Sequence, residues 1–463
     1  MRRERDTMGW VDIPENALWG AQTQRAVENF PISGERFGRD FIWAVGLVKL
    51  GCAQANQDMG LLDERRAAAI IQACREVMGG DWDEHFPIDV FQTGSGTSTN
   101  MNANEVIANR AIQILGGEIG SRGPIHPQDH VNLSQSSNDV IPTAIHLAAI
   151  RLTREKLIPA LHRLGEKLQV KSEAYQEVIK TGRTHLQDAL PIRMGQVFSG
   201  YAGQVQDGRK RAERAIQVLS ELPLGGTAVG TGANRPEGFP ELAVHYIGQH
   251  LDEELSITQN HVQGNASRDE LVEVSGLLKT IAVSLTKIAN DLRWMASGPR
   301  AGLNELKLER VQPGSSMMPG KNNPVIAEAL IMAAAQVIGN DAAVTQGGLG
   351  GYFEINLMMP LLARNIMESM ILLANAVSVF AERAVSGVEV HQDRCREMVE
   401  RNLSVVTFLV RAVGHDRAEE ISQEAFRSDR TIAEVAREQA VLPADELEEL
   451  LDLERMTGPY SVD

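Results

Sequence analysis

The segment most able to do chemistry is residues 314–324, which read GSSMMPGKNNP. This loop combines two hydroxyls, a fixed cation and side-chain amides between two glycines. A helical pattern follows, with Asn323 as its expected N-cap and Pro324 as its expected first residue. Hydroxyl, ammonium and amide groups beside a free helix N-terminus can bind an anion whose charge grows during a reaction. One such residue alone would indicate only a surface turn, but the whole run predicts a catalytic loop.

Three other runs are rich in polar side chains: residues 94–105 (GSGTSTNMNANE), 126–139 (HPQDHVNLSQSSND) and 181–188 (TGRTHLQD). The first two lead directly into helical patterns, where Ser, Thr and Asn commonly act as caps. Capping needs only one or two residues, so we expect the surplus side chains to bind carboxylate oxygens. The third run contains His185, whose imidazole titrates near physiological pH and suits general acid–base catalysis.

Together with residues 18–24 (LWGAQTQ) and 225–232 (GGTAVGTG), these runs resemble the motifs of the fumarase/aspartase superfamily. The resemblance follows the family's order and spacing and covers essentially the whole chain. Enzymes of that superfamily make or break a C–O or C–N bond beside a carboxylate. The Pro-Gly-Lys at residues 319–321 is the form typical of class II fumarases, although Asn322 stands where the family usually has Val.

The resemblance implies a reversible hydration of fumarate to (S)-malate that uses no cofactor and no metal. Ser315 would take the proton from C3 of malate, with loop amides and Lys321 stabilising its oxyanion. Lys321 and Asn323 would bind the carboxylate that becomes an aci-carboxylate dianion. His185 would handle the water that leaves or attacks. Glu328 lies one turn into a nearly apolar helix and needs a partner, and the resemblance pairs it with His185.

The substrate-binding positions implied by the resemblance are Ser95, Gly96, Thr97, Ser136, Ser137, Asn138, Thr184, Ser316, Lys321, Asn322 and Asn323. A second dicarboxylate site is implied at His126, Pro127, Gln128 and Asp129, where Gln128 replaces the family's usual Asn. The same run can instead be a helix-entry turn built around Pro127.

Two alternatives remain open from the sequence. The first is an aspartate ammonia-lyase, but those enzymes usually carry Ala at the positions of Ser95 and Gly320. The second is a non-catalytic superfamily member kept as a structural protein, as in some eye-lens crystallins. Against it, the chain retains the full set of implied catalytic residues: Ser315, His185, Lys321 and Glu328.

Composition narrows the class of protein and its partners. The chain has 463 residues, is 43% hydrophobic and only 5% aromatic, and so suits packed helices. A net charge of −16 argues against a nucleic-acid partner and requires local positive charge wherever a dicarboxylate binds. Three scattered cysteines indicate a reducing compartment. The start shows no signal-like segment and no apolar run appears long enough to span a membrane, so we expect a cytoplasmic protein.

Hydrophobic periodicity predicts a mainly α, three-domain, fumarase/aspartase-like fold. The expected domains are residues 1–137 with an irregular start, a central bundle at 138–392 and a small helical domain at 393–463. Long helices are expected at about 143–180, kinked at Pro159, and at about 192–220, 268–297, 324–346 and 356–385. Some stretches, such as residues 326–335, are apolar on every side, and one chain can hardly cover them all. We therefore expect a shared core, and the resemblance implies a homotetramer with active sites built from three subunits.

Overall fold

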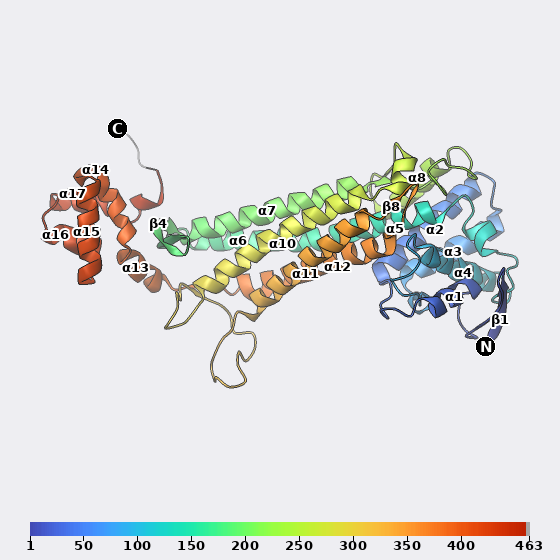
Figure 1. The fold of residues 1–463 in the computed structure, drawn as a ribbon, viewed down its shortest axis with the longest axis horizontal. Coiled ribbons are helices and arrows are strands. Elements are labelled where there is room, and N and C mark those ends of the chain that lie inside the picture. The colour runs from blue at the N-terminus through green and yellow to red at the C-terminus, as the bar shows by residue number, and fades with distance from the viewer. Residues whose placement is uncertain (460–463) are drawn as a thin grey trace. The chain divides into compact units, whose positions relative to one another are not determined.

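A computed structural model describes residues 1–459, and the chain is mainly helical (Figure 1). It forms two compact units. Unit 1 contains residues 1–159, 209–282 and 333–375, and unit 2 contains residues 160–208, 283–332 and the described residues from 376 to 459. The boundaries fall inside five helices, so each of these helices contributes to both units. The predicted division into three domains stays a prediction.

The first part of unit 1 has a hairpin of β1 (Arg2–Asp6) and β2 (Gly9–Ile13), then α1 (Ala21–Asn29), α2 (Arg39–Asp58), α3 (Glu64–Gly79), a short 3-10 turn at Asp83–His85, and α4 (Thr97–Ile114).

The sequence predicted an irregular start and missed α1. Its N-cap, Gly20, offers no side chain, and a distant carboxylate caps the helix instead. Glu105 of α4 accepts from the backbone N–H of Gly20 at 2.8 Å and from the Thr23 hydroxyl at 2.6 Å.

Helix α2 is enclosed on nearly every side. At Gly51 a side chain would begin 2.6 Å from Ile247, so the missing Cβ allows α8 (Phe239–Leu251) to pack directly against the α2 backbone. Lys49 lies in the middle of this helix and is 0% exposed. A fully enclosed ammonium is costly unless hydrogen bonds or charges compensate it.

The predicted helix of nearly 40 residues is present as α5 (Ser137–Leu152), a π-helical turn (Thr153–Leu157) and α6 (Ile158–Ala174). It begins inside the polar run, with Pro142 in its second turn, and ends before the expected residue 180. The π turn stands where Pro159 has no backbone N–H to donate to Glu155.

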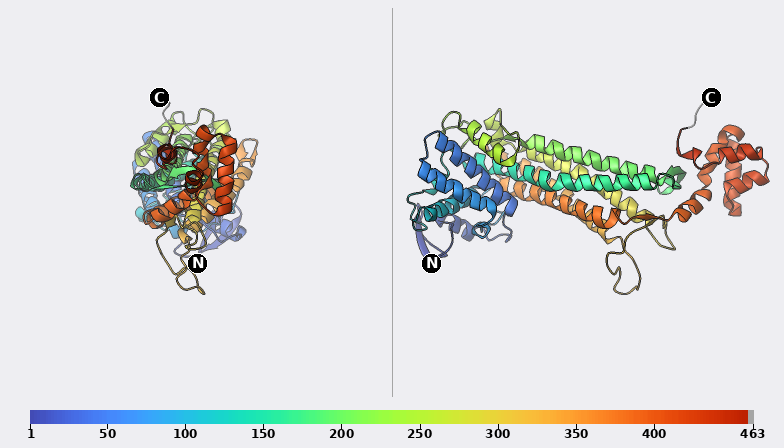
Figure 2. Two further views of the ribbon diagram at one scale, coloured as in Figure 1. Left: turned by 90° about the vertical axis from the view of Figure 1, so that its left-hand side faces the viewer. Right: turned by 180° about the vertical axis from the view of Figure 1, so that it is seen from behind.

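Four further long helices match their expected ranges to within a few residues: α7 (Met194–Leu219), α10 (Asp269–Met295), α11 (Val325–Gly348) and α12 (Met359–Phe380), the last continued by a π turn at Ala381–Val385. Within each unit, their segments run alongside one another (Figures 1 and 2). In unit 1, Ser275 of α10 donates to Asp341 of α11 at 2.8 Å. In unit 2, Tyr201 of α7 donates to Asp291 of α10, also at 2.8 Å.

Helix α11 differs from one expectation. Among the described residues, it is the one helix long and apolar enough to cross a membrane by length and composition, so the prediction that no run reaches that length is wrong. Only 33% of its most apolar window is buried. Its Asn340 and Asp341 hydrogen-bond to α12 and α10, which is the behaviour of a core helix in a bundle. Met332 on the same helix is 67% exposed, so the described part of this chain leaves its side chain largely uncovered.

The remaining elements are short. Unit 1 also holds π-helix Pro127–Val131, α9 (His261–Ala266), the parallel pair β5 (Glu221–Leu222) and β6 (Ser256–Ile257), and the pair β8 (Gly351–Tyr352) and β9 (Ile355–Asn356). Unit 2 holds the hairpin β3 (Ile179–Thr184) and β4 (Gln187–Arg193), the pair β7 (Leu306–Lys307) and β10 (Glu389–Val390), and α13 (Gln392–Glu400). After α13 come a 3-10 segment (Leu403–Leu409), α14 (Val410–Val413), α15 (His415–Ser428), α16 (Ile432–Glu438), α17 (Ala444–Leu450) and a 3-10 turn (Arg455–Thr457), several of which share a small apolar core.

Candidate active site

In the first polar run, the hydroxyls of Ser95 and Thr97 do not cap helix α4. Helix α4 is capped from outside the run, because the Gln92 side-chain oxygen accepts from the N–H and the hydroxyl of Thr99, at 3.0 and 2.9 Å. Ser95 and Thr97, just before and at the helix start, hydrogen-bond to each other at 2.7 Å. Their hydroxyls therefore stand at the helix N-terminus, where an anion binds favourably.

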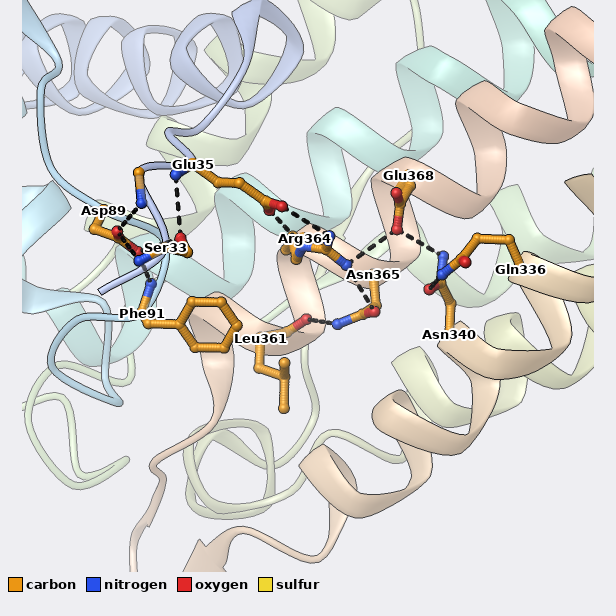
Figure 3. A network of polar contacts seen from close by, with 11 residues as sticks. Ser33, Glu35, Asp89, Phe91, Gln336, Asn340, Leu361, Arg364, Asn365 and Glu368 are labelled. Carbon is orange, nitrogen blue, oxygen red and sulfur yellow. Dashed lines mark hydrogen bonds and ion pairs between the residues drawn. The ribbon is translucent and has the colours of Figure 1, made fainter. Parts of the chain in front are cut away.

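A polar network supports the loop that leads into this run (Figure 3). The Asp89 carboxylate accepts from Ser33 and from the backbone N–H of Phe91. Arg364 of α12 donates to Glu35 at 2.7 Å and to Glu368 at 3.0 Å. Ser33 and Glu35 lie in one short segment, which contacts Asp89 on one side and Arg364 on the other. This segment therefore connects the loop ahead of α4 to α12 within unit 1.

The second run shapes the start of α5. Ser136 and Asp139 form a capping box, so the Ser136 oxygen is partly occupied by the helix. The Ser137 oxygen accepts from the Asn100 amide of α4 at 3.0 Å, and the Asn138 amide donates to the Ala228 carbonyl at 2.7 Å. These bonds bring residues 94–105, 132–139 and 225–232 together in unit 1.

Asp139 links the α5 start to the glycine-rich loop at 225–232. One carboxylate oxygen accepts from the backbone N–H of Gly225 at 3.0 Å and of Thr227 at 2.9 Å. Burial raises the pKa of Asp139, and the backbone donors together with Lys49 oppose that rise. The Asp139 side chain is thus fixed by backbone donors behind the site, where it organises the 225–232 loop. Ser137 and Asn138 remain at the surface of the site.

His185 lies at the tip of the β3–β4 hairpin in unit 2. Thr184 pairs with Gln187, so His185 and Leu186 form a two-residue turn with φ of 55° and 60°. Such a turn favours Asn or Gly, and each residue here carries a strain of about 1–3 kcal/mol. Strained positions of this kind cluster at functional sites. Thr184 and His185 are both exposed.

The hairpin borders a cavity of about 1080 Å³, lined among others by Lys180, Arg183, His185, Tyr201 and Asp291. Arg183 and Lys180 both face the buried carboxylate of Glu305, at 2.9 and 3.5 Å. Burial lowers the pKa of Lys180, and Glu305 opposes that shift. This cluster anchors the hairpin that carries His185.

The catalytic-loop candidate, residues 314–324, closes on itself. A Cβ on Gly314 would lie 2.1 Å from the Lys321 carbonyl oxygen, so only glycine allows the two ends of the loop to meet. Inside the loop, Ser315 Oγ accepts from the backbone N–H of Met317 at 3.2 Å and of Met318 at 2.9 Å. Two fixed N–H donors on a hydroxyl oxygen stabilise an oxyanion at that position.

Helix α11 begins at Val325, one residue later than predicted. The Pro324 carbonyl accepts the first helical bond from Glu328, so Pro324 takes the N-cap place that was expected for Asn323. The Asn323 amide donates instead to the Gly314 carbonyl and fastens the base of the loop.

Four predicted residues of this region line one cavity of about 640 Å³: Lys321, Asn322, Asn323 and Glu328. Arg293 and His391 line the same cavity and were not anticipated, because neither lies in a recognisable run. Within the described part of the chain, no hydrogen bond or ion pair joins His185 to Glu328, and His185 is absent from the lining of this cavity.

The residues of the implied second dicarboxylate site form a compact helix-entry turn. His126 caps the π-helix that starts at Pro127, and its ring lies 3.2 Å from the Asp129 carboxylate. The Gln128 amide donates to Gln22 of α1 at 2.7 Å. This geometry supports the turn alternative, and the second site stays a prediction.

Comparison with known proteins shows which family the chain belongs to. A lyase family profile, described as "Lyase", matches residues 9–339, and one described as "Fumarase C C-terminus" matches residues 405–458. A class II fumarate hydratase of Halobacterium salinarum is 50% identical over 456 residues, covering 98% of this chain and 97% of its own. One from Mycobacterium tuberculosis is 49% identical over 467 residues, covering 100% and 97%.

Solved structures agree. The class II fumarase of Schistosoma mansoni superposes with a TM-score of 0.96 at 34% identity, covering 99% of this chain and 100% of that one. The fumarate lyase:delta crystallin of Brucella melitensis bound to cobalt gives 0.95 at 45% identity with the same coverage. The fold and both profiles thus define a member of the fumarase/aspartase superfamily of lyases. Within that superfamily the chain belongs to the class II fumarate hydratases, as its motifs predicted.

Proposed function

We propose that the chain catalyses the reversible, cofactor-free hydration of fumarate to (S)-malate. The observation that carries this proposal is the pair of backbone N–H donors on Ser315 Oγ, in a loop whose Lys321 and Asn323 line the adjoining cavity. That arrangement favours a serine oxyanion, which the reaction needs as a carbon base. The full-length similarity to class II fumarate hydratases supports the same reaction.

In the dehydration of malate to fumarate, Ser315 takes the C3 proton and the electron pair moves into the adjacent carboxylate as an aci-carboxylate. Lys321 and Asn323 stabilise the added charge. The C2–O bond then breaks, and His185 protonates the departing hydroxide to give water and fumarate. Glu328 orients the His185 ring for this proton transfer.

The remaining residues of the predicted site bind the carboxylates of the substrate. They are Ser95, Gly96, Thr97, Ser136, Ser137, Asn138, Thr184, Ser316 and Asn322. The hydroxyls of Ser95 and Thr97 at a helix N-terminus support this role most directly.

The active form in this proposal is a homotetramer whose sites take residues from three subunits. Exposed apolar side chains on the long helices support assembly, with Met332 at 67%, Trp294 at 56% and Val283 at 55% exposed. The exposed position of His185 agrees with a site that a second subunit completes. We place the enzyme in the cytoplasm, because its three cysteines are all free, as in a reducing compartment.

A fumarate assay on the purified protein tests the reaction. Loss of fumarate absorbance in plain buffer, with malate as the product, is the expected result. Consumption that requires ammonium would indicate an aspartate ammonia-lyase instead. No consumption under either condition would favour a non-catalytic structural member of the superfamily.

A further inference from the structure

Lys49 is a buried cation that is held by side-chain amides. It is 0% exposed, and none of the ion pairs among the described residues includes it. Its ammonium donates to Asn132 Oδ1 at 3.0 Å and to Gln135 Oε1 at 2.9 Å. Both acceptors lie in the loop that leads into the start of α5 at Ser136 and Ser137.

The ammonium fixes the direction of a chain of hydrogen bonds. A lysine ammonium has donors only, so the Asn132 side chain must turn its oxygen toward Lys49. The same oxygen then accepts from the Asn100 amide nitrogen at 3.1 Å and the Asn104 amide nitrogen at 3.2 Å. Both of these α4 amides must therefore present nitrogen to Asn132.

This orientation leaves polar atoms unsatisfied. Asn100 Oδ1 and Asn104 Oδ1 are buried and have no hydrogen-bond partner in the described chain. A buried acceptor without a donor costs about 1–3 kcal/mol. The Lys49–Asn132 contact imposes the orientation in spite of that cost.

The chain of hydrogen bonds ends at the predicted substrate site. Asn100 Nδ2 also donates to Ser137 Oγ at 3.0 Å, which makes the Ser137 oxygen an acceptor. No other hydrogen bond engages this half-exposed hydroxyl among the described residues, so its proton is free to donate outward. With the Asn100 amide reversed, its oxygen would accept that proton and the serine would offer only lone pairs.

We propose that Lys49 is a positioning residue that orients the Asn132 and Asn100 amides so that Ser137 presents its hydroxyl proton to a substrate carboxylate. This inference rests on the proposed function, because it takes Ser137 as a binder of the dicarboxylate. Lys49 itself touches no substrate and acts only through the two amides.

The charged surroundings of Lys49 agree with this role at neutral pH. The titratable groups facing it are Cys52 in α2, Cys74 in α3 and Asp139 in α5, and α4 presents only amides. Burial raises the pKa of both thiols, that of Cys74 to about 12, so both are neutral. Burial lowers the pKa of Lys49 to about 8, and above that pH its neutral amine gains a lone pair and no longer dictates the amide orientation.

The test is a double-mutant cycle on the full-length enzyme with fumarate as substrate. Lys49→Met keeps the length and removes the charge, and we expect it to raise KM about tenfold with kcat within about twofold of wild type. In a Ser137→Ala background the same change should leave KM unmoved, because the hydroxyl that Lys49 orients is gone. The ratio of KM between Lys49→Met and wild type should be largest below pH 8 and should shrink above it.

Cys52→Ala is the matched control. Cys52 lies almost one turn further along α2, is equally buried and is absent from this chain of hydrogen bonds, so its KM should equal that of wild type. If Lys49→Met does not fold, Lys49→Gln serves in its place, since a neutral amide can turn either end toward Asn132.

An unchanged KM in the folded variant, or equal effects of the Lys49 change with and without the Ser137→Ala substitution, would overturn the role of Lys49. Wild-type protein without activity on fumarate would contradict the proposed function instead. In that case calorimetric titration of the same proteins with fumarate tests Lys49 through Kd in place of KM.

Discussion

Arg183 and Glu305 form a buried ion pair in which one guanidinium nitrogen, Nη1, lies 2.9 and 3.0 Å from the two carboxylate oxygens. Glu305 is 0% exposed, and Lys180 approaches the same carboxylate at 3.5 Å. Arg183 stands two residues before His185 on the hairpin, and Glu305 opens the segment that leads to the catalytic loop. One buried carboxylate therefore joins two of the segments that carry the proposed chemistry.

Replacing the Glu305 carboxylate should lower the stability of unit 2. Glu305→Ala leaves the buried Lys180 and the partly buried Arg183 without their shared acid, and we expect a loss of about 3–5 kcal/mol in the free energy of unfolding. Urea unfolding at equal protein concentration measures the loss. Glu309→Gln, an exposed acid four residues on, is the matched control and should change stability by less than about 0.5 kcal/mol. Equal stability of the two variants would show that Glu305 does not hold the hairpin.

Ser315→Ala should remove most of kcat and leave KM little changed. The backbone donors on Ser315 Oγ favour its oxyanion, which exists only as the C3 proton is transferred. Steady-state kinetics with malate as the substrate measure the effect. Met317→Leu alters an exposed side chain of the same loop without touching the hydroxyl and is the control. A Ser315→Ala enzyme within a few-fold of the control would exclude Ser315 as the base.

The long helices were predictable from the sequence, because uninterrupted apolar periodicity determines where a helix packs. α7, α10, α11 and α12 all lie close to their expected ranges. Helix α1 was missed for a physical reason. Its cap is the carboxylate of Glu105, which is 82 to 85 residues away in the chain, and no local sequence pattern predicts such a contact.

The site was predictable in part. Runs of hydroxyls and amides pointed to Ser95, Ser137 and Ser315, whose contacts the structure now describes. No pattern pointed to Lys49, because a lone lysine in an apolar helix looks like a surface residue until its burial is known. The pairing of His185 with Glu328 was proposed from resemblance, and within the described part of one chain no hydrogen bond or ion pair joins them.

Burial of Lys49 has a consequence for stability that depends on pH. Its pKa is about 8 in the fold and 10.5 when unperturbed, so between these values the unfolded chain binds more protons and the stability of the wild type rises with pH. Below pH 8 the enclosed charge costs about 3 kcal/mol, which Lys49→Met avoids. The stability advantage of Lys49→Met over wild type should therefore fall by about that amount from pH 7 to pH 10.5.

Urea unfolding of both proteins across that range checks this expectation. Lost hydrogen bonds to Asn132 and Gln135 add an offset that does not vary with pH, so the slope and not the absolute difference is diagnostic. A difference that is flat between pH 7 and 10.5 would contradict the lowered pKa.

Assembly should depend on the apolar face of α11. If a second subunit covers Met332, then Met332→Lys places a charge in an interface and should give smaller, inactive species. Light scattering should find about four times 50.6 kDa for the wild type. Met8→Lys, at a residue 79% exposed in the β1–β2 turn, is the control and should assemble normally. If either the wild type or the Met332→Lys variant is active as a monomer, the active sites are not shared between subunits.

Charge and shape can be separated at Lys321, which lines the cavity beside Asn323 and Glu328. A chain of net charge −16 needs a local cation for a dicarboxylate, most of all when the aci-carboxylate forms. Lys321→Met keeps the length and removes the charge, and should lower kcat/KM about a hundredfold or more, on the order of 3 kcal/mol. Lys321→Arg keeps the charge on a planar fork that differs from a compact ammonium, and should recover only part of the activity.

Lys156→Met, at an exposed lysine paired with Asp40, is the control for loss of one positive charge and should match wild type. The electrostatic role requires Lys321→Met to be the worse of the two Lys321 variants. If both are equally inactive, the loop demands the shape of lysine at this position and not its charge. If both approach the activity of the control, Lys321 does not meet the substrate, and the anion must be held by Asn323 and the backbone of the loop alone.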